Sequence, residues 1–168
     1  MAARLDGELA ALDGAWTPVD EIEQPLHRAL SLALRLPDRV IIEQRSAAWV
    51  WGATILPPPE HQLCAAIGAR VRPGPGWPQV REVVIDDDEI WTLGGAKVTS
   101  PMRTVIDLAR FAEPFDDALA GTVLALARIG GVTIGDCLAA VEARRNLPSK
   151  RRARAVLGTL RDQAELTR

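Results

Sequence analysis

The chain has 168 residues, 48 % of them hydrophobic, and its 20 basic and 22 acidic side chains give a net charge of −2. A domain of this length buries roughly 70 % of its unfolded surface, so the composition excludes a disordered chain and a disulfide-dense mini-protein. Cys64 and Cys137 are too few for a disulfide framework. The sequence has neither an export signal nor an apolar run that could span a membrane, and we therefore expect a cytoplasmic protein.

The sequence predicts a single α+β domain, residues 1–168, made of three zones. Residues 1–37 have a helical pattern, with an amphipathic segment over residues 3–13 and a helix over His27–Leu36 that Pro37 ends. Residues 38–99 predict a small, mostly antiparallel sheet with a short helix after Ser46. The expected strands are Arg39–Glu43, Gln62–Val71, Val80–Ile85, Glu89–Leu93 and Ala96–Thr99. We expect the third and fourth of these to form a hairpin around Asp86–Asp88.

Residues 100–168 predict a bundle of four helices. Ser100 and Pro101 have the residue types of an N-cap and a first helical position, and this helix is expected to run to about Ala112. The other three are expected over Asp116–Ile129, from Thr133 or Asp136 to about Arg145, and from Pro148 and Ser149 to near the C-terminus.

Enzymatic chemistry finds little support in the residue pattern. The acidic run Asp86–Glu89 matches no calcium loop, and a tight turn between strands is the usual place for solvated aspartates. A degenerate metal-dependent nuclease around Asp86–Asp88 is a third, weaker hypothesis. His27 and His61 have no partner at metal-ligand spacing, and G-x-S-x-G and phosphate-loop patterns are absent. We therefore expect no enzyme, no metal site and no cofactor.

The predicted helix after Ser100 has a polar line opposite its apolar stripe. Arg103, Asp107 and Arg110 fall at i, i+4 and i+7, so their side chains stack. They form either an ion-pair ladder, which the spacing alone favours, or a polar stripe for a partner protein. Trp77, in a Pro/Gly-rich loop, is a candidate exposed anchor for the same partner.

The basic segment, residues 144–154, contains six positive charges and no acid: Arg144, Arg145, Lys150, Arg151, Arg152 and Arg154. Residues 1–143 have a net charge of −8 and residues 144–168 one of +6, so the neutral total hides a basic C-terminal part. Cations in the first turns of a helix oppose the macrodipole, so helix stability does not explain them. The segment predicts contact with DNA or an acidic protein; the alternative is a solvated face.

Two motifs and the helical tail carry a family resemblance over roughly residues 25–160. Arg45–Gly52 reads RSAAWVWG and Gly95–Arg110 reads GAKVTSPMRTVIDLAR. These segments resemble the core of AbiEi-type antitoxins from type IV toxin–antitoxin systems of actinobacteria. The matching positions of the second motif are Thr99, Pro101, Arg103, Thr104, Asp107, Leu108, Ala109 and Arg110.

The resemblance implies a protein that binds and neutralises a nucleotidyltransferase-like toxin. Members of the family also have an N-terminal winged helix that represses the operon, and some continue into a Vsr-like endonuclease domain. About 37 residues precede the first predicted strand and the sequence ends at Arg168, so we expect neither a full winged helix nor the nuclease domain. The leading hypothesis is a non-enzymatic antitoxin with Arg103, Asp107, Arg110 and Trp77 at its partner interface. The alternative is a regulator that binds operator DNA through the basic segment.

Overall fold

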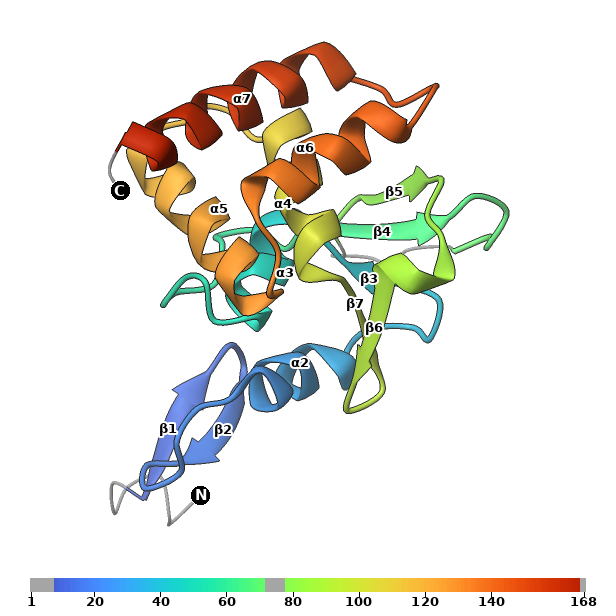
Figure 1. Ribbon diagram of the computed structural model, residues 1–168. Coiled ribbons are helices and arrows are strands. Elements are labelled where there is room, and N and C mark those ends of the chain that lie inside the picture. The colour runs from blue at the N-terminus through green and yellow to red at the C-terminus, as the bar shows by residue number, and fades with distance from the viewer. Residues whose placement is uncertain (1–7, 72–77, 167–168) are drawn as a thin grey trace.

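The computed structural model describes residues 8–71 and 78–166. A two-stranded hairpin and helix α2 lie at one end of the molecule, a five-stranded sheet lies in the middle, and the C-terminal helices pack at the other end (Figure 1). The fold is α+β, as the sequence predicts.

No single helix in the described ranges is both long and apolar enough to cross a bilayer. Helices α5 (Asp117–Ile129) and α6 (Ile134–Ala143) reach that length and composition only together, and they meet at a 90° bend.

The N-terminal zone begins with a hairpin, which corrects the helical prediction there. Strands β1 (Leu9–Leu12) and β2 (Ala15–Pro18) pair antiparallel, with Leu12 opposite Ala15. The turn residues Asp13 and Gly14 have φ of 44° and 80°. Asp-Gly is favoured in two-residue hairpin turns because both residues tolerate this left-handed conformation, and that signal outweighs a short amphipathic pattern. The helix in this zone is α2 (Pro25–Ala33), close to its predicted position.

The central sheet has the strand order β5-β4-β3-β7-β6. Its strands are β3 (Ile41–Ile42), β4 (Leu63–Ala66), β5 (Val80–Val83), β6 (Ile90–Leu93) and β7 (Ala96–Thr99). The β3–β4 and β6–β7 pairs are antiparallel, whereas the β3–β7 and β4–β5 pairs are parallel, so this sheet is mixed. The predicted hairpin between β5 and β6 is wrong, because the two strands lie at opposite edges. Between them, the 3₁₀ turn η1 (Asp87–Glu89) carries the acidic run from one edge to the other.

The four predicted C-terminal helices are confirmed as α4 (Pro101–Phe111), α5 (Asp117–Ile129), α6 (Ile134–Ala143) and α7 (Lys150–Leu166). Side-chain oxygens of Ser100, Asp116 and Thr133 each accept a hydrogen bond from the backbone N–H three residues later. These bonds satisfy donors that the first turn of a helix leaves without partners, and so fix where each helix begins.

Helix α4 lies at the centre of the fold. It packs against α5, α6 and α7 and against the short helix α3 (Gln44–Val50), which precedes the β4 strand. The main hydrophobic core joins residues of all three zones, and its large, fully buried side chains include Trp49, Leu108, Leu126 and Leu157. Because α4 has neighbours on every side, its polar line is enclosed along with its apolar stripe.

Candidate functional site

The motif residues of α4 form a buried ion-pair network. Arg103, Asp107 and Arg110 are 3 %, 0 % and 5 % exposed. The Asp107 carboxylate accepts from Arg103 Nε at 2.7 Å and from Arg110 Nη1 at 2.6 Å. The predicted ladder is confirmed, but its position on a partner-facing surface is wrong: Asp107 is fully enclosed and no partner can reach it. The spacing shows which residues share a line on the helix; it does not show that the sheet and the α6–α7 connection cover that line.

Glu89 connects this ladder to the sheet and to the start of the basic segment. Its carboxylate accepts from Arg103 Nη1 at 2.6 Å, from Arg144 Nη2, and from the backbone N–H of Asp86 at 3.2 Å. Burial raises the Glu89 pKa, but the positive charge of Arg103 and the hydrogen bond from Arg144 outweigh it and hold that pKa below its usual range. Asp86–Asp88 are exposed, as predicted for a solvated turn, whereas Glu89 is not.

Arg81, on strand β5, forms a second ion pair close to this network. Its Nε and Nη2 donate to the buried Glu43 at 3.1 and 2.6 Å. The guanidinium groups of Arg81 and Arg110 each lie 4.3 Å from the centre of the Phe111 ring, a distance at which cations are attracted to an aromatic face. The sequence pattern does not indicate Arg81 or Glu43 as site residues, because neither lies near α4 in the sequence.

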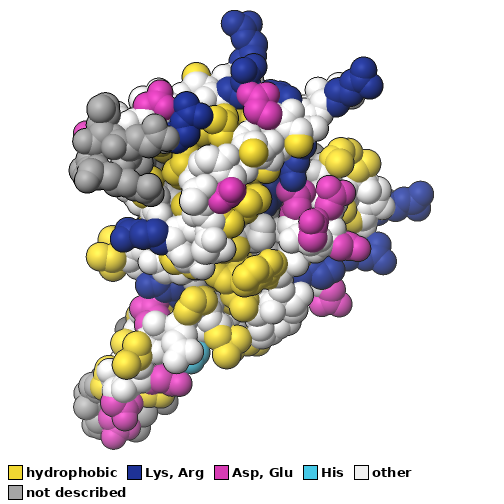
Figure 2. Space-filling view, viewed as in Figure 1, with side chains coloured by type: hydrophobic (Ala, Val, Ile, Leu, Met, Phe, Trp, Pro, Cys, Tyr) yellow, Lys and Arg dark blue, Asp and Glu magenta, His cyan; other side chains and the backbone are white. Residues whose placement is uncertain are grey.

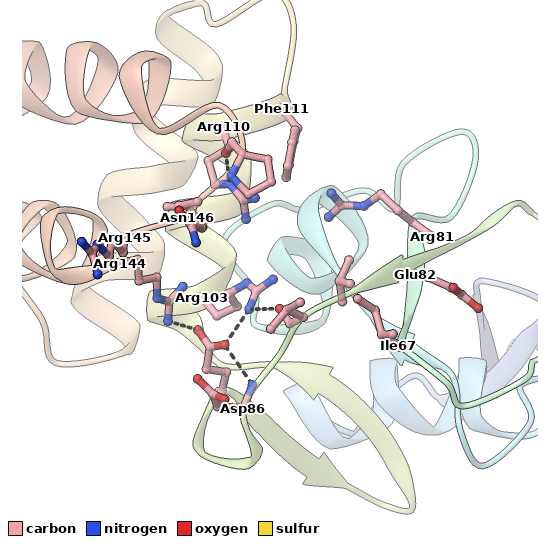
Figure 3. A pocket seen from close by; sticks show the side chains of 15 residues that line it. Ile67, Arg81, Glu82, Asp86, Arg103, Arg110, Phe111, Arg144, Arg145 and Asn146 are labelled. Carbon is pink, nitrogen blue, oxygen red and sulfur yellow. Dashed lines mark hydrogen bonds and ion pairs between the residues drawn. The ribbon is translucent and has the colours of Figure 1, made fainter.

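A cavity of about 520 Å³ opens between α4, β5 and the α6–α7 connection. Arginines supply much of its wall: Arg81, Arg103, Arg110, Arg144 and Arg145. Figure 3 shows the guanidinium groups of Arg81, Arg103 and Arg110 directed toward a common space, with Asn146 beside it. This geometry suits the binding of an anion.

Neither cysteine is a nucleophile in this arrangement. Burial and the negative charge of Glu43 raise the pKa of the Cys64 thiol, which lies beneath the network. Burial also raises the pKa of Cys137, to about 12. Both thiols therefore stay protonated at neutral pH, and a protonated thiol is neither a nucleophile nor a good metal ligand.

Ser46, His61 and Asp13 form a hydrogen-bonded chain that resembles a catalytic triad in composition. Ser46 Oγ lies 3.1 Å from His61 Nδ1, and His61 Nε2 lies 3.0 Å from Asp13 Oδ2. However, Ser46 is fully buried on α3, and its Oγ already accepts from the Gln62 N–H at 2.9 Å. A substrate carbonyl cannot reach this oxygen. The chain of bonds instead ties the turn of the β1–β2 hairpin to the body of the protein.

The basic segment is partly neutralised by acids that are distant in the sequence. Arg144 pairs with Glu89, Arg152 with Glu113, and both Lys150 and Arg154 with Glu142. Arg145 and Arg151 are exposed and have no ion pair with any residue that the structure describes. Of the six basic residues predicted to contact nucleic acid, these two are exposed and have a charge that no acid among the described residues neutralises.

The remaining predicted features add no further site. Trp77 lies outside the described residues. Residues 8–71 and 78–166 contain no group of three or more His, Cys, Asp or Glu side chains that could hold a metal ion.

No protein-family model matches this chain, and no curated protein matches it significantly.

Proposed function

We propose that the chain binds a protein partner through an apolar stripe on α2 that faces solvent. Leu26, Leu30 and Leu34 are four residues apart, on one face of the helix and its C-cap, and are 41 %, 38 % and 84 % exposed. The space-filling view shows hydrophobic side chains from the middle of the molecule down to this end (Figure 2). Contiguous exposed apolar groups on a folded protein mark contact surfaces, because leaving them in water is unfavourable.

The stripe continues onto the edge of the sheet. A Cβ at Gly94, in the β6–β7 turn, would lie 2.6 Å from Leu30 Cδ2 and 2.9 Å from Leu26 Cδ1, so this turn is packed directly on the stripe. Strand β6 is an edge strand, and Trp91 on it is 49 % exposed. A partner seated here would meet leucines, an aromatic ring and unpaired backbone groups together.

Acidic side chains border this surface. Residues 8–24 contain five acidic residues and no lysine, arginine or histidine. Glu8, Asp20, Glu21 and Glu23 among them are exposed, although Glu23 pairs with Arg28 and Glu21 lies 3.3 Å from His27 Nε2. A complementary partner surface would therefore place apolar side chains at its centre and lysines or arginines around them.

We propose that the chain is a cytoplasmic, non-enzymatic, AbiEi-like antitoxin that binds and neutralises a nucleotidyltransferase-like toxin through this α2–β6 surface. The α4 motif supports the family assignment, and the acid-bordered apolar stripe is the observation that supports binding of a protein. In this proposal the buried ion pairs of Arg103, Asp107 and Arg110 have an indirect role: they stabilise the fold on which the α2–β6 surface lies.

Co-expression with the product of the adjacent open reading frame tests this function. We expect the neighbour to be toxic alone and harmless when the chain is present, and L30D to lower the affinity between the two purified proteins at least tenfold. Val84, 76 % exposed just after β5 at the opposite sheet edge, provides the matched control, and V84D should change the affinity less than twofold. A harmless neighbour, or full neutralisation by L30D, would contradict the proposal.

The two free cations of the basic segment favour DNA binding as a second candidate function. Arg145 and Arg151 are exposed and unpaired among the described residues, and dark blue side chains extend from this end of the molecule in Figure 2. If the chain binds its own promoter duplex, its affinity should fall steeply with salt, and the double variant R145Q/R151Q should reduce the slope of log K against log salt by about 2. The matched control is Arg128→Gln, an exposed arginine on α5. An unchanged slope, or no binding at low salt, would exclude this function.

A further inference from the structure

Three buried or half-buried arginines bring unused donors to the cavity. Arg81, Arg103 and Arg110 each donate through Nε and one terminal nitrogen. The other terminal nitrogen of each has no hydrogen-bond acceptor among the described residues. Every fully buried side-chain nitrogen or oxygen in that part of the chain does have a partner. The three spare NH₂ groups therefore reach open space, and the cavity is the space that all three side chains line.

The arginines of the ion-pair network outnumber its carboxylates. Four guanidinium groups, from Arg81, Arg103, Arg110 and Arg144, pair with the three carboxylates of Glu43, Glu89 and Asp107, so the network has one more positive charge than negative. Two exposed residues that also line the cavity, Arg145 and Asp86, have opposite charges and offset each other. Glu82 also lines the cavity, but it is exposed and its carboxylate points away from the three converging guanidinium groups in Figure 3. An anion in the cavity would complete the neutralisation.

The donors are held in place before any ligand binds. Phe111 contacts both Arg81 and Arg110, and the Pro148 carbonyl accepts from Arg110 Nε at 2.9 Å. Burial lowers the Arg110 pKa, and the neighbouring charges of Arg103 and Arg81 lower it further against the opposing effect of Asp107. The carboxylates of Glu43, Glu89 and Asp107, in contrast, raise the pKa values of Arg81 and Arg103 against the effect of burial. An anion beside Arg110 would therefore relieve the repulsion that acts on this residue, and it would bind without ordering flexible side chains.

We propose that this cavity is a binding site for a phosphate group, carried by a soluble phosphorylated molecule up to the size of a nucleoside monophosphate. Guanidinium groups match the geometry of phosphate oxygens, and three spare NH₂ groups plus the Asn146 amide suit a group with several acceptor oxygens. The volume of about 520 Å³ is within the range of small-molecule pockets and exceeds what an inorganic ion needs. This site is separate from the α2–β6 surface and does not depend on the proposed antitoxin function.

Calorimetric titration with sodium phosphate and with adenosine 5′-monophosphate, at low ionic strength, tests the site. We expect saturable binding of one phosphate group per chain. Tighter binding of the nucleotide would show that the remaining volume is used, and equal affinities would define a site for the phosphate group alone. Both results support the proposal, whereas no saturable binding of either probe overturns it.

Two variants with the same change in net charge distinguish phosphate binding in the cavity from nonspecific attraction to a positively charged surface. Asn146→Asp and Arg151→Gln each lower the net charge by one at an exposed position, but Asn146 lines the cavity and Arg151 does not. We expect N146D to weaken phosphate binding at least tenfold and R151Q less than twofold, with unchanged thermal unfolding. Arg81→Lys, which keeps a cation near Glu43 but removes the spare NH₂ group, should also weaken binding. Equal losses in N146D and R151Q would overturn the proposal.

Discussion

Replacing Asp107 by asparagine is expected to destabilise the protein by about 3–5 kcal/mol, the cost of removing one partner from a buried ion pair. Asp107 is fully buried and accepts from two arginines that are themselves almost fully buried. The asparagine amide has nearly the same shape but no charge, so Arg110 would be left without a counter-ion in the interior. Arg103 would keep Glu89. Urea-induced unfolding, followed by circular dichroism, measures the change in the free energy of unfolding.

The matched control for this variant is an ion pair on the surface of α7. Asp162 pairs with Arg161 at 2.9 Å, but its side chain is 64 % exposed, and D162N should change the free energy of unfolding by less than about 0.5 kcal/mol. A loss below about 1 kcal/mol for D107N would contradict the full burial of the Asp107 carboxylate.

Glu89→Gln is expected to cost about 2–3 kcal/mol at neutral pH, because the carboxylate accepts charged hydrogen bonds from Arg103 and Arg144. The pKa of Glu89 in the folded protein is lowered from its ordinary value of 4.5. A lowered carboxyl pKa stabilises the fold above the unfolded-state value, and this contribution is lost as the pH falls through the folded-state pKa. The wild-type protein should therefore lose stability as the pH falls below about 4.5.

Unfolding curves recorded across the acid range distinguish this group from the other carboxylates. E89Q should show a shallower decline than the wild type, since the glutamine has no proton to take up. Asp88→Asn, which removes an exposed acid of the same turn, should leave the slope as in the wild type. Parallel curves for E89Q and the wild type would mean that Glu89 does not contribute to acid unfolding.

Local sequence signals predicted the helical half of the fold well. Ser100, Asp116 and Thr133 cap their helices with their own side chains, so the residue types alone mark where the helices begin. Strand pairing was harder to predict, because it depends on contacts between distant segments. The acidic residues between β5 and β6 have the composition of a tight turn, yet the chain crosses from one sheet edge to the other there.

The candidate site was predicted only in part. The spacing of Arg103, Asp107 and Arg110 gave their mutual ion pairs, because neighbours on one helix are fixed by its geometry. Their burial depends on the sheet and on the α6–α7 connection, which no local pattern describes. Glu89 and Arg81 come from other elements, and only the tertiary structure brings them to α4. The pairing of Glu113 and Glu142 with part of the basic segment likewise depends on contacts between distant residues, which no local pattern describes.

The central strand of the sheet has a consequence for how the chain folds. Strand β3 consists of Ile41 and Ile42 alone, and Ile41 pairs with Cys64 on one side and with Lys97 on the other. Neither pairing can form until long stretches of chain have been brought together, whereas α4 to α7 follow one another with short connections. Contacts between distant residues slow folding because the intervening loop must close first. We therefore expect the helical half to gain structure early and the closure of the sheet around β3 to set the folding rate.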